Sequence, residues 1–191
     1  MGSMGSFSMD GMKQLKKQME KLQEQDAYAF IEACAKELAA RLLAELIRNT
    51  PVGDYSKEIE VTAKRDSKHH KKGDTYTKRV NPSGKMGGTL RRGWTSRTQE
   101  EAESGKGRPS VQDAKEYANA LEIRHEGNQL VIDLINPVEY GIYVNFGHRT
   151  RGHKGWVPGQ FFVEKSEAQV QKNAPKVLEA RLKKFLEECI G

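Results

Sequence analysis

The sequence predicts an α+β fold in which a small antiparallel β-sheet packs against two long α-helices, with a long basic loop in the middle of the chain. The helices are predicted from two segments, 27–48 and 160–190, whose apolar residues recur at helical spacing. The sheet is predicted from residues 121–125 and 129–135, where apolar and polar residues alternate on either side of the turn sequence Glu126-Gly127-Asn128.

The ends of the predicted helices follow from local sequence signals. Asp26 is placed to cap the first long helix, and Pro51 ends it because the residue before a proline disfavours helical backbone. A thinner apolar stripe predicts a further helix over residues 10–25. Pro175 lies inside the last helix, and we expect a kink or a break near residues 172–174, since proline removes one backbone hydrogen bond.

The middle of the chain predicts shorter elements. Residues 57–63 alternate and predict a strand that joins the hairpin in one sheet. Residues 64–88 and 99–111 are rich in Gly, Pro, Ser and charged residues and predict mobile loops. The other predicted elements are short helices, at residues 89–94, 113–121 and 138–146.

The length of 191 residues predicts a single α+β domain over residues 10–190, and residues 1–9 read as a flexible N-terminus or the remnant of an expression tag. No apolar run approaches the roughly 18 residues that a membrane helix needs, so we expect no membrane contact. Cys34 and Cys189 lie in apolar helical patterns and are predicted to be small core residues in a reducing compartment.

The net charge of +6 is concentrated in one region of the chain. Residues 64–108 hold thirteen Lys and Arg against five Asp and Glu. Such a basic stretch attracts nucleic acid or acidic protein surfaces. The residues predicted to line a channel or to contact an acidic partner are Lys64, Arg65, Lys68, Lys71, Lys72, Lys78, Arg79 and Lys85.

No group of residues predicts catalysis or metal binding. His69 and His70 lie among lysines, and His148 and His153 lie beside arginine and lysine, where anions bind more readily than metal ions. The carboxylates of residues 100–103 lack an apolar pocket that would raise a pKa. We therefore predict that the protein is not an enzyme and uses no metal or cofactor.

Four short motifs occur in a specific order along the chain. They are Phe7 to Leu15, Thr50-Pro51-Val52-Gly53, Gly88-Thr89-Leu90-Arg91-Arg92-Gly93-Trp94, and Tyr140 to Arg151 followed by Trp156-Val157-Pro158. Together they resemble the minor tail-component family of tailed bacteriophages, whose members form the neck or head–tail joining region.

The resemblance implies a structural virion protein that assembles as a ring, expected to be a hexamer, at the neck or the head-proximal end of a phage or prophage-derived tail. The ring would join head to tail or terminate the tail tube. Its partners would be other copies, adjacent connector and tail-tube or terminator proteins, and passing DNA. The residues expected at interfaces are Leu90, Arg91, Trp94, Tyr140, Tyr143, Phe146, His148, Arg149, Arg151 and Trp156.

Several alternatives stay open at this point. Tyr143 and Phe146 could instead be core residues of their short helix, and Leu90 and Trp94 could be core residues rather than intersubunit anchors. The alternative function is a nucleic-acid-binding protein that uses the basic 64–85 loop, although the sequence holds no recognition-helix pattern or zinc signature. Binding of DNA by the monomer with a steep salt dependence would favour it.

Overall fold

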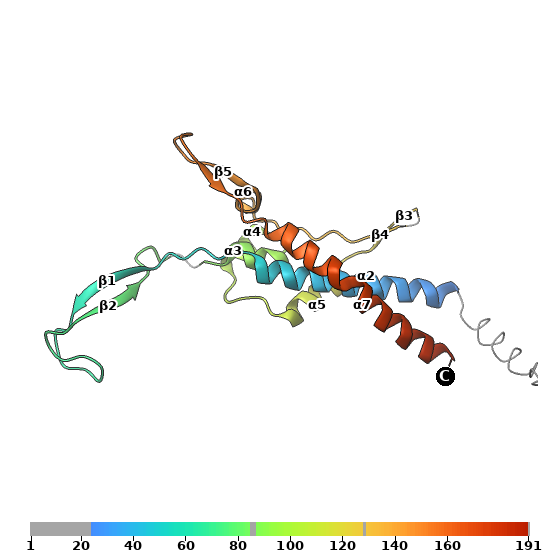
Figure 1. The fold of residues 1–191 in the computed structure, drawn as a ribbon, viewed down its shortest axis with the longest axis horizontal. Helices are drawn as coiled ribbons and strands as arrows, with labels where there is room; N and C mark the ends of the chain where they lie inside the picture. The colour runs from blue at the N-terminus through green and yellow to red at the C-terminus, as the bar shows by residue number, and fades with distance from the viewer. Residues whose placement is uncertain (1–23, 85–86, 128, 191) are drawn as a thin grey trace, which may run out of the picture. The chain divides into compact units, whose positions relative to one another are not determined.

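A computed structural model describes residues 24–84, 87–127 and 129–190 (Figure 1). The chain divides into two compact units. Unit 1 contains the chain up to residue 49, residues 109–135 and the chain from residue 161 onward. Unit 2 contains residues 50–108 and 136–160, so the chain passes from one unit to the other four times. Both helices and antiparallel strands are present, which confirms the predicted α+β class.

Unit 1 is built on one long helix that contacts two others. α2 (Glu24–Asn49) packs against both α5 (Val111–Ala120) and α7 (Phe162–Ile190). The rings of Phe30 and Phe185 stack between α2 and α7 with their centroids 4.5 Å apart. Buried residues from all three helices form the core, namely Cys34, Ala39, Leu43, Leu46, Ile47, Ala114, Ala118 and Phe162. The two predicted long helices are therefore confirmed, as is the burial of Cys34.

Other predictions in unit 1 have mixed outcomes. The hairpin of β3 (Arg124–Glu126) and β4 (Gln129–Val131) is confirmed but is shorter than predicted. Of the kink or break predicted near residues 172–174, the break is wrong, because α7 continues through Pro175. The packing of α7 against α2 offsets the loss of one backbone hydrogen bond. The helix predicted over residues 10–25 and the side chain of Cys189 lie essentially outside the described residues.

Unit 2 combines short helices with two hairpins. The helices are α3 (Thr89–Arg92), the 3-10 turn η1 (Gly93–Thr95), α4 (Gln99–Ser104) and α6 (Gly141–Phe146). The hairpins pair β1 (Lys57–Thr62) with β2 (Thr75–Val80), and β5 (Gly147–Arg149) with β6 (Trp156–Pro158). The core residues are Leu90, Trp94, Ala102 and Val138. The helical turn predicted at residues 89–94 and the helix predicted at 138–146 are confirmed.

Three predictions about the middle of the chain are wrong. The strand at residues 57–62 does not join the β3–β4 hairpin, because it pairs with β2 in a separate two-stranded sheet. The loop predicted over residues 64–88 therefore contains a strand, and the loop predicted over 99–111 contains α4. Both elements are largely exposed, so they lack the apolar pattern that identifies buried elements in a sequence.

A buried hydrogen bond in unit 2 gives a first prediction. The indole Nε1 of Trp94 donates to Thr50 Oγ1 at 2.8 Å, and the Thr50 side chain is fully buried. Replacing Thr50 with valine keeps the shape but leaves the indole N–H without this acceptor. We expect the free energy of unfolding to fall by about 1–2 kcal/mol. Urea denaturation followed by tryptophan fluorescence measures this change.

The matched control is Thr62→Val, which makes the same change at an exposed position of β1. Its effect should stay within about 0.5 kcal/mol. Equal stability of both variants and the unmodified protein would show that the Trp94–Thr50 bond contributes nothing.

Candidate partner-binding surface

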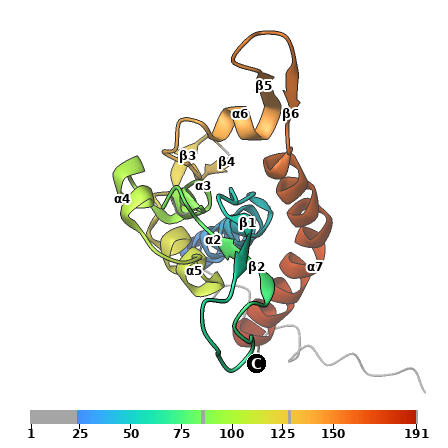
Figure 2. The ribbon, with the colours of Figure 1, turned by 90° about the vertical axis from the view of Figure 1, so that its left-hand side faces the viewer.

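α6 and the β5–β6 hairpin expose several large apolar side chains on unit 2, and Figure 2 shows the hairpin leading directly from α6. Ile142, Tyr143 and Phe146 of α6 are 60%, 58% and 53% exposed, and their spacing allows neighbouring positions on the helix surface. Trp156 and Val157 of β6 are 60% and 41% exposed. We call these five residues the aromatic surface.

The backbone around the aromatic surface is held by defined contacts. Gln160 N donates to Val144 O at 3.0 Å, which ties the end of the hairpin back to α6. The rings of Tyr143 and His148 meet edge to face with centroids 6.3 Å apart. Asn145, between these aromatic residues, is buried. The aromatic side chains are therefore exposed on a helix that is itself anchored.

Gly147 sets the turn from α6 into β5 and gives a second prediction. Its φ of +87° is one that residues with a side chain rarely adopt, and an added Cβ would lie 2.5 Å from Val157 O and 2.8 Å from Gly159 N. Gly147→Ala should therefore disrupt the β5–β6 hairpin at a cost of about 2 kcal/mol. The readouts are urea denaturation and the fluorescence of Trp156.

Gly152→Ala is the control in the same hairpin, because its Cβ would meet no atom within 4 Å. This variant should behave like the unmodified protein. A Gly147→Ala protein with unchanged stability and unchanged Trp156 fluorescence would contradict the proposed role of Gly147.

Basic residues surround the tip of the β5–β6 hairpin. His148, Arg149, Arg151, His153 and Lys154 are exposed, and within the described residues none of them makes a salt bridge. The combination of exposed aromatic residues and unpaired arginines is enriched in protein–protein interfaces. The aromatic surface with this basic rim is suited to an apolar partner surface that carries carboxylates.

The exposure of the predicted interface residues decides which of them can lie at an interface. Tyr143 and Phe146 are more than half exposed, so the alternative that they are core residues is wrong. Leu90 and Trp94 are 3% and 7% exposed and lie in the core of unit 2, as their alternative predicts. Arg91 donates to Thr50 O at 2.6 Å, and burial lowers the pKa of its guanidinium. We therefore leave Leu90, Arg91 and Trp94 out of the surface.

Tyr140 is 43% exposed at the start of α6, and burial raises the pKa of its hydroxyl. It lines a hollow of about 290 Å³ in unit 2, together with Tyr55, Thr89 and Leu90. This hollow lies beside the aromatic surface, since both use residues of α6. Tyr140 thus stays adjacent to the proposed surface.

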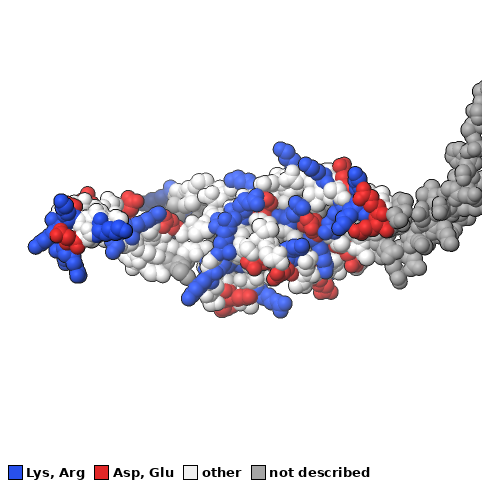
Figure 3. All heavy atoms as spheres, turned by 90° about the horizontal axis from the view of Figure 1, so that it is seen from below, with Lys and Arg blue, Asp and Glu red and all other residues white. Residues whose placement is uncertain are grey.

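Seven of the eight predicted basic residues lie on the β1–β2 hairpin, residues 57–80, which we call the arm. Lys64, Arg65, Lys68, Lys71 and Lys72 lie in the loop that joins its strands, and Figure 3 shows Lys and Arg gathered at its end. Lys78 and Arg79 lie in β2, where Arg79 forms a salt bridge with Asp54. Hydrogen bonds from Ser56, together with Arg79, lower the pKa of Asp54. Lys85 lies outside the described residues.

Sequence reasoning missed α4 and the buried Arg92 beside it. Thr98 caps α4 by accepting from Glu101 N at 3.2 Å, and the Glu101 carboxylate accepts from Arg97 N at 2.7 Å. A Thr followed three residues later by Glu is a known signal for a helix start and could have identified α4. Arg92 is 6% exposed and donates to Ala102 O at 2.8 Å, but no sequence signal distinguished it from the basic residues around it.

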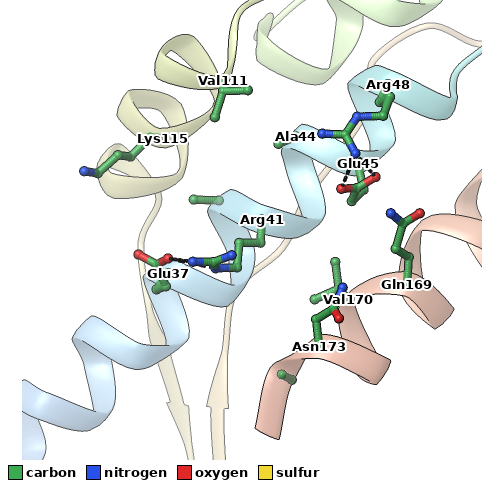
Figure 4. A pocket seen from close by; sticks show the side chains of 12 residues that line it. Glu37, Arg41, Ala44, Glu45, Arg48, Val111, Lys115, Gln169, Val170 and Asn173 are labelled. Carbon is green, nitrogen blue, oxygen red and sulfur yellow. Dashed lines mark hydrogen bonds and ion pairs between the residues drawn. The ribbon is translucent and has the colours of Figure 1, made fainter. Parts of the chain in front are cut away.

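A groove of about 300 Å³ lies between α2, α5 and α7 of unit 1, and Figure 4 shows its side chains. The carboxylates on its rim are paired, Glu37 with Arg41 and Glu45 with Arg48. Between them it is lined by alanine, valine and amide side chains. The described residues contain no group of three or more His, Cys, Asp or Glu that could hold a metal ion. No helix in the same part of the chain is long and apolar enough to cross a membrane.

Comparison with known proteins relates the chain to phages. Residues 13–87 match the family model described as "Bacteriophage HK97-gp10, putative tail-component". Over these residues the chain is similar to a phage tail-component family. The predicted resemblance is thereby confirmed. No curated protein and no solved structure matches the chain.

The tail-component match covers α2 and the arm, and it ends before α3. It therefore includes the basic residues of the arm but not the aromatic surface. The motif at residues 140–151, which also carried the resemblance, lies outside the matched residues.

Proposed function

We propose that this chain is a structural, non-enzymatic virion protein that forms a ring, expected to be a hexamer, at the neck or the head-proximal end of a phage tail. The single observation that carries the proposal is the match of residues 13–87 to a phage tail-component family. A ring of this kind would join head to tail or terminate the tail tube. The other tail and connector proteins would be its partners.

The aromatic surface supports a role in assembly. Isolated exposed apolar residues are common in monomeric proteins, but α6 and β6 of this chain expose five of them, each more than two-fifths exposed. Such a cluster is stabilised when a partner covers it. We propose that the aromatic surface and its basic rim contact an adjacent virion protein, with Arg149 and Arg151 meeting carboxylates of that partner.

The proposal is tested on particles of the phage or prophage that encodes the chain. Gold-labelled antibody against the chain should mark the neck or the top of the tail in negative-stain micrographs. Deletion of the gene should give unjoined heads and tails or tails of uncontrolled length, and a plasmid copy should restore normal particles. Absence of label from all particles, together with normal particles after deletion, would overturn the proposal.

A further inference from the structure

The arm makes no extensive contact with any other described helix or strand of its own chain. β1 and β2 pack extensively only on each other among the described elements. The strand register places Ile59, Val61, Tyr76 and Val80 on one face, and Ile59 is 42% exposed. An isolated two-stranded hairpin is at best marginally stable in water. The arm would therefore gain stability from a surface that covers it.

In the loop at the end of the arm, the carboxylates are hydrogen-bonded to the backbone, so they do not pair with the described lysine and arginine side chains. Its two carboxylates accept hydrogen bonds from the backbone: Asp66 accepts from Lys72 N and Asp74 accepts from Lys71 N, each at 2.7 Å. The ring of His70 stacks on Tyr76 with centroids 3.9 Å apart, which folds the loop back onto the strands. Lys64, Arg65, Lys68, Lys71 and Lys72 are exposed, and the described residues offer them no salt bridge.

A complementary acidic element lies elsewhere in unit 2. Among the helices of the described residues, only α4 carries acidic side chains and no basic one. Glu100, Glu101 and Glu103 are exposed and form no salt bridge within the described part of the chain. Hydrogen bonds from its own backbone and from Thr98 lower the pKa of Glu100.

We propose that the end of the arm of one copy docks on α4 of a second copy, with the lysines of the loop facing the three glutamates. The arm makes no extensive contact with α4 of its own copy, which leaves both surfaces available to meet in different copies. A contact between two different surfaces of the same protein is head-to-tail, and repeating it builds a ring or an open chain of subunits. The role of this contact in closing a ring rests on the function proposed above.

The contact is tested with equal amounts of unlabelled and 15N-labelled full-length chain. A carbodiimide joins a lysine amine directly to a carboxylate, so it reports only ion pairs in contact. We expect mixed-isotope cross-links between the loop lysines and Glu100 or Glu103. Sedimentation should show self-association that weakens at least tenfold between about 0.05 and 0.5 M salt, because charge pairs are screened.

Charge reversal at each side then tests the pairing. One double variant carries Lys71→Glu and Lys72→Glu in the arm, and the other carries Glu100→Lys and Glu103→Lys in α4. Each double variant alone should fail to self-associate. Mixing the two variants should restore association. Glu101 is left unchanged because its carboxylate accepts the Arg97 backbone N–H at the start of α4. The matched control is Lys183→Glu with Lys184→Glu on α7, two exposed lysines, which should associate normally.

Any of three results would overturn the contact. The first is that the chain stays monomeric up to its solubility limit. The second is that both charge-reversed variants still self-associate. The third is that the arm variant loses binding to duplex DNA while its self-association is unchanged. The last result would assign the arm to nucleic acid. None of them bears on whether the chain is found in tails, so the function proposed above is tested separately.

Discussion

Replacing Arg92 with alanine should lower the free energy of unfolding by about 3 kcal/mol, since it removes a buried cation and leaves its acceptors unpaired. The guanidinium is 6% exposed and donates to Ala102 O at 2.8 Å and to Gly87 O at 3.2 Å. It thereby connects α3 to α4 and to the segment before α3. Urea denaturation followed by the fluorescence of Trp94, which lies two residues away in the core, measures the effect.

The control for this prediction is Arg97→Ala, which removes an exposed arginine from the same short region. Its unfolding free energy should change by less than about 0.5 kcal/mol. The interpretation of Arg92 as the connection between α3 and α4 would be abandoned if both variants unfolded at the same urea concentration. Arg92→Lys should recover only part of the loss, because an ammonium cannot reproduce the planar fork of donors.

Replacing Tyr143 and Trp156 together with serine should reduce incorporation of the chain into particles by at least tenfold while leaving it folded. Both side chains are more than half exposed, so their removal should change the unfolding free energy little. Large aromatic residues near the centre of an interface each contribute about 2 kcal/mol or more to binding. Quantitative mass spectrometry of purified particles, after complementation of the deleted gene, measures incorporation.

The matched variant removes two equally exposed apolar residues from unit 1. Val111 and Ile135 are 69% and 67% exposed, and Val111→Ser with Ile135→Ser should be incorporated normally. Normal incorporation of the Tyr143 and Trp156 double variant would show that the aromatic surface is not used in assembly. A variant that fails in particles and also unfolds at lower temperature would have to be replaced by Tyr143→Ser alone.

The sequence predicted those parts of the fold in which burial leaves a periodic pattern. α2 was identified because Cys34, Leu46 and Ile47, all of them buried, recur at helical spacing, and α7 because a similar apolar series includes the buried Phe162. β2 was missed because most of its side chains are exposed, so its alternation of apolar residues is reduced to Tyr76 and Val80. α4 was missed because it buries one alanine and exposes glutamates, a composition shared by polar loops.

The candidate surface was predicted in part. The aromatic and basic residues of segment 140–156 were chosen for their type, and the structure shows that Tyr143, Phe146 and Trp156 are exposed whereas Leu90 and Trp94 are buried. Residue type alone could not separate these two groups, because an aromatic residue in a short helix suits a core and an interface equally. The sequence predicted no strand over residues 147–158, because each strand of the β5–β6 hairpin has only three residues.

The path of the chain between the two units has a consequence for gene exchange. Unit 1 is assembled from three separate stretches of chain and unit 2 from two, in alternation. No single uninterrupted piece of the gene therefore encodes either unit. Recombination that replaces one contiguous piece of coding sequence would exchange part of a unit, or segments of both, and would leave mismatched halves of a core. We expect related genes to be inherited across this region as a block, with viable crossovers concentrated outside it.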